Sequence, residues 1–519
     1  MIRVLRPLMT VFLVLLVVGV VSLRLDPLSA RAQQGDQRLD GRLRPQPPGQ
    51  QERQAVEQTL RIPAFPRLTT VRAIGLDTAR ARLGRQMPRG HRVIAGHVEG
   101  SATAYMPDVE APFFRQITFV PRTGPSTKFD HATATARIIY GRGGLAPGIR
   151  TVHAFSSLEW IGDDYLRTST ELPPLEDDPI RVFSHSWITD ETRGIEQVLR
   201  RVDYQIDTRD VVMAVGVNNG EESQIPAALA SAYNVIAVGS INGRSSRGTT
   251  RLDGVGRSKP DIVAPGGMTS FTTPAVAAAA AMLIEAGEVL DEHADLAQRS
   301  EVIKAILMAG ATKPDSWEQR AGRPLADQMG AGLLNIDNAL KILQSGAMAL
   351  PDHPAVDLSE AAEAEVEEAR IVRRFGWAVD SLERHQSRRI TLKANRLLGP
   401  ISIMLVWNRQ IRGEVVGPPF STRPVWLPRP LLSDVDIKLL ALPDEEAGPE
   451  AAATVYAESS SRVDNVEHLY IEALPPGEYE LVITRHPFPL TYEPAEQEVA
   501  LAWRIELPSD QPAVSEAAD

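Results

Sequence analysis

The sequence predicts a large α/β domain with a mainly parallel sheet, followed by a smaller all-β domain. Up to about residue 343, short apolar strands alternate with helix-like segments, which is typical of parallel strands joined by helical crossovers. From about Trp377 the pattern changes to short β-type runs separated by turns rich in proline and glycine. A chain of 519 residues can hold two or three domains and bury at least one large core.

The composition excludes several kinds of protein. The chain contains no cysteine, so it has no disulfide bonds, no thiolate catalysis and no zinc site with thiolate ligands. A formal net charge of -11 argues against nucleic acid or an anionic membrane as the main partner. The oligomeric state is left open by these numbers.

The N-terminal region is expected to lie outside the folded domains. Residues 1–32 combine a basic start, an apolar stretch over about 8–23 and an A-x-A signature at 30–32, which predicts a secretory signal peptide. The apolar stretch is shorter than the roughly 20 residues of a spanning helix, so an uncleaved anchor is the less favoured alternative. Residues 33–62, rich in Gln, Arg, Pro and Gly, are predicted to form a disordered linker. We therefore expect a secreted or periplasmic protein with no stable membrane insertion after signal cleavage.

Residues 63–345 carry the alternating pattern of the α/β domain. In such parallel sheets, functional groups collect at the carboxyl ends of the strands. The predicted strands are Val93–Val98, Ile149–Ala154, Arg181–Ser184, Val211–Gly216, Asn234–Val238 and Asp261–Ala264. The predicted helices are Thr78–Leu83, Ala132–Tyr140, Gly194–Val202, Ile225–Ala230 and Glu301–Ala309, with a further buried helix after Ser270.

Ser270 precedes the most apolar of these helices. The last predicted strand ends at a Pro-Gly-Gly break, and Thr269 and Ser270 then lead into a run of Ala and Val. At a helix N-terminus, the backbone N–H groups and the helix dipole favour negative charge, which a nucleophilic serine needs for its oxyanion. An ordinary helix cap is the alternative for a lone serine. The letters KPDIVAPG, then TS, then TP after two further residues resemble the nucleophile motif of the subtilisin-like serine proteases.

Three more segments resemble that family. Glu99 ends the first apolar strand where the family has its triad aspartate, which implies that Glu99 orients the catalytic imidazole. The run DHATATARII resembles the histidine motif and implies that His131 is the general base. In VVMAVGVNNG, Asn218 matches the asparagine that donates to the oxyanion, and Asn219 is the alternative if the turn is shifted by one residue.

The resemblance implies a secreted serine endopeptidase that acts on protein or peptide substrates through an acyl-enzyme on Ser270. The segment Phe183–Ile188 resembles the family's substrate-binding strand, and Ser186 matches its serine. Val217 and Ile188 stand where the family has glycines that wall the pocket for the residue before the cut. We therefore predict a narrowed pocket that prefers small side chains. No cofactor is identified.

The remainder of the chain is predicted to be a charged linker at 346–375, a β-sandwich at 376–508 and a disordered acidic tail at 509–519. The sandwich resembles the jelly-roll domains that follow some secreted subtilisin-like domains. Asp434 and Asp436 could help to bind calcium, although paired acids at a strand start are more often solvated. The β-type runs are Arg389–Lys393, Ile401–Trp407, Val435–Ala441, His468–Ala473, Gly477–Thr484 and Glu498–Ile505.

Two other interpretations compete with the peptidase. Departures from the family favour a catalytically inactive binding or scaffold protein: Glu99 replaces aspartate, two alanines interrupt the histidine motif, Met268 replaces glycine, and no folded propeptide is evident. The groups that carry the chemistry all remain, so we predict the enzyme. A metal site at His97, Glu99 and His131 is the other alternative, since His97 and Glu99 share a strand face; no further ligand is evident, and we predict no metal there.

Overall fold

The structure is a computed structural model, and all its described residues belong to one unit within residues 43–519. The predicted signal peptide and the acidic tail lie outside the described residues, as do residues 33–62 apart from Arg53 and most of the charged linker. The residues that the structure describes are 53, 68–170, 172–189, 191–348, 356–357, 374–417, 425–443, 452–487 and 493–506.

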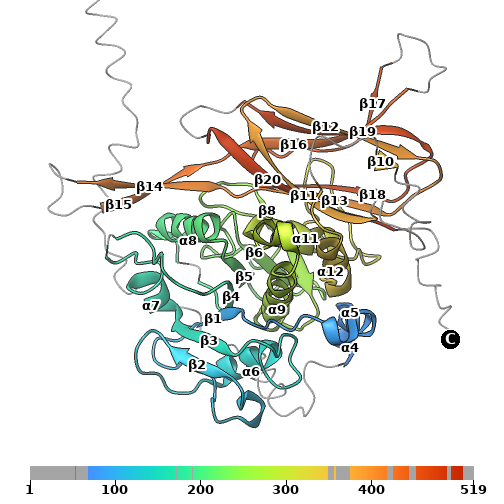
Figure 1. The fold of residues 1–519 in the computed structure, drawn as a ribbon. Helices are drawn as coiled ribbons and strands as arrows, with labels where there is room; N and C mark the ends of the chain where they lie inside the picture. The colour runs from blue at the N-terminus through green and yellow to red at the C-terminus, as the bar shows by residue number, and fades with distance from the viewer. Residues whose placement is uncertain are drawn as a thin grey trace, which may run out of the picture. The chain divides into compact units, whose positions relative to one another are not determined.

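A seven-stranded parallel sheet forms the centre of the first domain (Figure 1). Its strand order is β2-β3-β1-β4-β5-β6-β9, and each pair of neighbours is parallel. Most of its strands are buried along their length, as expected when both faces are covered. The predicted α/β fold class is thus confirmed. The strands are β1 (Ile94–Glu99), β2 (Thr118–Pro121), β3 (Thr151–Ser156), β4 (Val182–His185), β5 (Val212–Gly216), β6 (Ile236–Ser240) and β9 (Ile262–Ala264), and a separate pair is β7 (Gly248–Thr249) with β8 (Ser258–Lys259).

Helices pack around this sheet, and α9 lies at its centre. Helix α9 contacts β4, β5 and β6 and also packs against α6. Among the described helices, α9 is the one long and apolar enough to cross a membrane, but 94% of that stretch is buried inside the protein. It is therefore a core helix. The helices are α4 (Leu68–Ala73), α5 (Leu76–Leu83), α6 (Asp130–Ile139), α7 (Ser157–Gly162), α8 (Ile195–Arg209), α9 (Thr269–Gly287), α10 (Ala294–Ala297), α11 (Ser300–Gly310) and α12 (Ile336–Gln344), with short 3-10 turns at Gly84–Gln86, Pro112–Phe114 and Asp291–His293.

The predicted helix at Ile225–Ala230 is wrong. The structure has bends and a turn there, and Leu229 has a φ of 53°. A residue in this left-handed region cannot continue a right-handed helix. The segment is nevertheless buried, which explains why its apolar composition resembles that of a core helix.

The C-terminal part consists of antiparallel strands in two main sheets and one hairpin, which confirms the predicted β domain. The five-stranded sheet has the order β10-β12-β19-β16-β17, in which only β10 pairs in parallel, and the four-stranded sheet has the order β11-β20-β13-β18. The strands are β10 (Val356–Asp357), β11 (Phe375–Glu383), β12 (Ser387–Ala394), β13 (Ile401–Val406), β14 (Gln410–Val416), β15 (Val425–Leu431), β16 (Asp434–Ala441), β17 (Thr454–Ser459), β18 (Val466–Ile471), β19 (Gly477–His486) and β20 (Glu496–Ile505).

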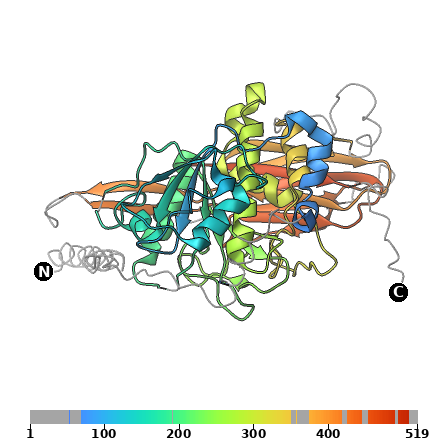
Figure 2. The same ribbon diagram turned by 90° about the horizontal axis from the view of Figure 1, so that it is seen from below.

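The four-stranded sheet is buried on both faces. In β13, Ile403 and Leu405 join the interior of the sandwich, whereas Met404 and Val406 join the core of the α/β domain. This division follows from the alternation of side chains along a strand. Helix α11 contacts both β13 and β20 and also contacts α9, and Figure 1 shows it beside the orange and red strands. Figure 2 shows these strands behind the helices of the α/β domain. The two domains therefore share one continuous hydrophobic core.

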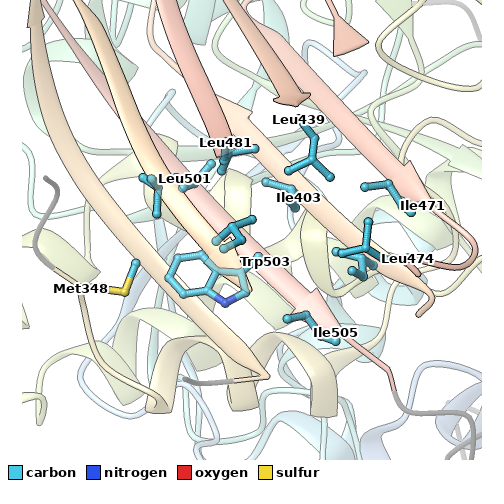
Figure 3. Close-up of a pocket in the computed structure, with 12 residues that line it drawn as sticks. Met348, Ile403, Leu439, Ile471, Leu474, Leu481, Leu501, Trp503 and Ile505 are labelled. Atoms are coloured by element: carbon cyan, nitrogen blue, oxygen red, sulfur yellow. The ribbon is translucent and has the colours of Figure 1, made fainter. Parts of the chain in front are cut away.

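A small apolar cavity of about 40 Å³ lies inside the sandwich. Figure 3 shows aliphatic side chains from both sheets around Trp503, with Met348 at one side. All twelve lining residues are hydrophobic, and a cavity of this kind stays dry. We assign it to the packing of the sandwich.

The hairpin of β14 and β15 packs on α8. The Arg201 guanidinium lies 4.7 Å from the ring centre of Trp426, and the Tyr204 ring lies 5.0 Å from the same indole. Ile411 of the hairpin donates a backbone hydrogen bond to the carboxyl group of Asp207. The hairpin thus covers an acidic side chain of the α/β domain, Asp207, which stays partly exposed.

Because Asp207 is covered by the hairpin, we expect the stability of the protein to depend on pH. Burial raises the pKa of Asp207 to about 7 from 3.8, although the hydrogen bond from Ile411 opposes the shift. The folded state therefore holds this proton more tightly than the unfolded state, so stability is lost as pH rises from 3.8 to about 7. We expect Asp207→Asn to raise Tm at pH 8 and to change it little at pH 4. Thermal unfolding at both pH values, with the exposed Asp177→Asn as the control, measures this; an equal change in Tm at both would contradict it.

Candidate active site

Three elements bring the predicted catalytic residues to one edge of the parallel sheet. Glu99 is the last residue of β1, His131 is the second residue of α6, and Ser270 is the second residue of α9. The His131 ring lies 6.2 Å from the ring of Phe271, which follows Ser270, and α6 packs on α9. This edge is where the carboxyl ends of parallel strands meet. Their exposed fractions are 0% for Glu99, 5% for His131 and 6% for Ser270, so all three are shielded from bulk water.

A short hydrogen bond joins the acid to the imidazole. Nδ1 of His131 lies 2.7 Å from Oε2 of Glu99. The Thr135 hydroxyl, one helical turn after His131, donates to Oε1 of Glu99 over 2.7 Å. Nε2 of His97 lies 3.2 Å from that same oxygen. Both oxygens of the buried carboxylate are therefore hydrogen-bonded, as a buried charge requires.

These contacts keep Glu99 ionised. Burial alone would raise its pKa, but the charge and hydrogen bond of His131, together with His97, outweigh burial and lower it to about 2. Glu99 consequently carries a negative charge at any pH at which an imidazole can act as a base. A glutamate at this place thus provides the charge that a triad acid must provide.

The carbonyl of Ser270 is bonded to the residue after a neighbouring strand, because Pro274 cannot bond to it within the helix. It lies inside α9 and has no N–H, so the carbonyl of Ser270 cannot accept the usual hydrogen bond from the residue four positions later. That carbonyl instead accepts a hydrogen bond of 3.1 Å from the hydroxyl of Ser186, just after β4. The predicted substrate-strand residue Ser186 therefore also anchors the first turn of the helix that carries Ser270.

The two asparagines after β5 are placed differently. Asn218 is held through its backbone, which exchanges hydrogen bonds with Ser246 over 2.9 and 2.8 Å. The side chain of Asn219 reaches α9, where its Oδ1 accepts from the Thr269 N–H over 2.9 Å and from the Thr269 hydroxyl over 3.1 Å. The structure thus brings Asn219, the alternative in the sequence interpretation, to the first turn of the helix that carries Ser270.

The residues predicted to wall a substrate pocket differ in exposure. Val217 is fully buried, whereas Ile188 is partly buried. Gly216, just before Val217, allows a close approach to α9, because a Cβ there would lie 3.2 Å from the Thr273 hydroxyl. Val217, directly after β5, is thus enclosed by the protein.

The structure gives no support for a metal site in the described part of the chain. No group of three or more histidine or acidic side chains there is arranged to hold a metal ion. His97, Glu99 and His131 do come together, but through hydrogen bonds. Near the predicted calcium ligands, His486 contacts the carboxylate of Asp436 at 2.9 Å.

Two residues that contact Glu99, Thr135 and His97, are not predicted from the sequence as partners of the acid. Thr135 does not stand out, although its position four residues after His131 places both on one face of α6. From the sequence, His97 stands out only as a candidate metal ligand. Its spacing of two residues from Glu99 shows that they share a strand face, but spacing alone does not show what the imidazole bonds to.

Comparison with known proteins gives a match to a family model and several similar solved structures. Residues 117–332 match the family model Peptidase S8, the subtilase family. Similar solved structures include fervidolysin from Fervidobacterium pennivorans, a keratinolytic enzyme related to subtilisin, at 14% identity with a TM-score of 0.36, covering 78% of this chain and 69% of that chain. MycP1 from Mycobacterium smegmatis is similar at 17% identity with a TM-score of 0.31, covering 54% and 85%, respectively. Comparison with curated proteins gave no match.

These structural similarities, with TM-scores of 0.36 and 0.31, add nothing to the family match. The matched range contains His131, Ser186, Asn219 and Ser270, whereas Glu99 precedes it. The assignment of the acid therefore depends on the geometry described above. Residues 117–332, which make up less than half of the chain, are therefore similar to the subtilase family.

Proposed function

We propose that this protein is a secreted serine endopeptidase that cleaves protein or peptide substrates at Ser270. The observation that carries the proposal is the 2.7 Å hydrogen bond between the buried, ionised Glu99 and His131, at the N-terminal end of the helix that presents Ser270. Secretion follows from the predicted signal peptide.

The hydrogen bond to Glu99 decides the role of each ring nitrogen of His131. An ionised carboxylate can only accept, so Nδ1 carries the proton and Nε2 is the basic nitrogen. Nε2 takes the proton of the Ser270 hydroxyl as the serine oxygen attacks the amide carbonyl. The protonated His131 then gives this proton to the departing amine, and the acyl-enzyme remains on Ser270. Water, deprotonated by His131, releases the second product.

The oxyanion formed on attack requires donors at the end of α9. The N–H groups of the first turn of a helix, that of Ser270 included, point out of the helix end. Asn219 adds a side-chain donor in our proposal. Because Oδ1 of Asn219 already accepts from Thr269, its Nδ2 donors must point elsewhere, and the substrate carbonyl is the acceptor that we infer.

Asn219 and Asn218 give a matched pair of variants. We expect Asn219→Ala to lower kcat by about 10²- to 10³-fold with little change in KM, which is the usual effect of losing one oxyanion donor. Asn218→Ala is expected to lower kcat much less. Steady-state kinetics on a peptide substrate, with Tm measured to detect loss of the Thr269 contact, checks this. If only Asn218→Ala lowers kcat strongly, Asn218 and not Asn219 is the oxyanion donor.

The buried Val217 supports a preference for small side chains before the cut. It is enclosed by the protein directly after β5, so we expect a peptide-library profile dominated by Ala, Gly and Ser at that position. Val217→Gly is expected to shift the profile toward larger residues. Cleavage of the library by both proteins measures the effect, and a wild-type preference for Phe or Leu would contradict the narrowed pocket.

Hydrolysis of casein by the purified mature protein tests the function itself. Ser270→Ala, prepared in the same way, is the control for contaminating proteases. The proposal predicts cleavage by the wild type and none by the variant. Equal cleavage by both would assign the activity to a contaminant, and binding of peptides without cleavage would favour the inactive binding protein.

A further inference from the structure

We propose that His97 is a positioning residue for the catalytic acid, and that it allows a glutamate to do what an aspartate would do at the end of β1. The inference rests on the proposed peptidase function. The hydrogen-bonding groups of His97 lead to Glu99 and Thr135, so it acts through Glu99.

The contacts divide the Glu99 carboxylate between two sets of partners. Oε2 bonds to Nδ1 of His131 at 2.7 Å. Oε1 bonds to the hydroxyl of Thr135 at 2.7 Å and to Nε2 of His97 at 3.2 Å. Nε2 of His97 also lies 3.1 Å from the Thr135 hydroxyl, so the three groups form a closed cluster. Thr135 and His97 thus hold Oε1, while Oε2 bonds to the imidazole of His131.

A glutamate needs this support more than an aspartate would. Its additional methylene adds one rotatable bond between the strand and the carboxylate, and a misplacement of about 1 Å at a catalytic group can cost about a hundredfold in rate. Two donors on Oε1 fix the plane of the carboxylate. They therefore restrict the extra bond to the rotamer that presents Oε2 to His131.

The surroundings of His97 make Nε2 the ring nitrogen that donates to Glu99. Its side chain is fully buried, and its Nδ1 has no hydrogen-bond partner in the described part of the chain. Because the ionised carboxylate can only accept, the Nε2 that faces Glu99 carries the proton of this contact. The ring of Tyr140, at the end of α6, packs edge-on against His97 at 5.8 Å and holds its orientation. The titratable groups that act on Glu99 are thus His131, His97 and, at longer range, Tyr140.

Two substitutions of His97 distinguish its hydrogen-bond donation to Glu99 from its packing in the buried site. His97→Leu keeps an apolar side chain in the buried site but removes the donor, and we expect kcat to fall about tenfold to a hundredfold with KM nearly unchanged. His97→Gln places an amide N–H at the distance of Nε2, and we expect it to retain most of the activity. The pattern of a defective Leu variant and a rescued Gln variant is the positive result.

His468 provides the matched control. It is 1% exposed, its Nε2 lies 3.0 Å from the hydroxyl of Ser402, and its Nδ1 also has no partner among the described residues. It lies on β18 in the β domain. His468→Leu therefore reproduces the loss of a buried imidazole without touching Glu99, and we expect it to lower Tm while kcat stays near the wild-type value.

A double-mutant cycle with Glu99→Gln shows whether His97 acts through Glu99. If it does, adding His97→Leu to the Glu99→Gln protein will lower kcat only slightly further. If instead the double variant loses the product of the two single-variant losses in kcat, the proposal is overturned. A second readout does not need activity: the downfield NMR signal of the His131 Nδ1 proton should move or broaden in His97→Leu and not in His468→Leu. An unchanged signal overturns the positioning role, whereas a changed signal in a protein that cleaves nothing supports it and counts only against the peptidase.

Discussion

Replacement of Glu99 by glutamine is expected to lower kcat for peptide hydrolysis by about 10⁴-fold, with KM nearly unchanged. Thr135 and His97 both donate to the Oε1 position, so the new amide will place its carbonyl oxygen there. Its NH₂ group then faces Nδ1 of His131 and requires a lone pair on that nitrogen. The ring proton is forced onto Nε2, and His131 can no longer accept the proton of Ser270.

The variant Glu99→Asp tests whether the length of the side chain matters as well as its charge. Aspartate keeps the charge but withdraws the carboxylate by about one bond length, so we expect an intermediate loss of about tenfold to a hundredfold. Steady-state kinetics over pH 6 to 9 measures both variants, with Tm as the test of folding. A glutamine variant with wild-type kcat would show that Glu99 is not the triad acid.

Replacement of Arg409 by methionine is expected to lower the free energy of unfolding by about 3–5 kcal/mol. Arg409 precedes β14 but inserts into the α/β domain, where Nε bonds to Asp203 at 2.8 Å and the guanidinium bonds to Asp253 at 2.7 Å. It also lies 4.2 Å from the ring centre of Tyr233. Burial disfavours its charge, but the two carboxylates outweigh burial and raise the pKa of Arg409. Methionine would leave Asp203, which is fully buried, without its cation.

Arg429 is the control for this variant. It forms an ion pair of 3.4 Å with Glu414 on the exposed part of the same hairpin, where such pairs contribute about 0–1 kcal/mol. Urea unfolding followed by circular dichroism and by tryptophan fluorescence measures both variants. Because the domains share one core, we expect one coincident transition for the wild type. Two separate unfolding transitions in the wild type would contradict the shared core. A decrease in the free energy of unfolding that is no larger in Arg409→Met than in Arg429→Met would contradict it as well.

Local patterns predicted the parallel sheet and the place of Ser270, because alternating strands and helices and a helix start are properties of neighbouring residues. The support of the site depends on contacts between distant residues, which local patterns do not contain. The bond from Arg409 to Asp203, for example, joins residues 206 positions apart. Strand β15 is not predicted from the sequence, because Pro428 and Pro430 argue against a strand. Among the described strands it pairs with β14 in a two-stranded sheet, and an edge strand of this kind accepts proline.

Covalent labelling of the mature protein by a fluorophosphonate probe, with the labelled residue mapped by mass spectrometry, tests the central claim most directly. An activated serine displaces fluoride from the probe, and an ordinary helix-capping serine does not react. We predict a single label on Ser270 that disappears in Ser270→Ala. Protein that is folded by circular dichroism but stays unlabelled would contradict the peptidase and leave a subtilase fold that binds without cleaving.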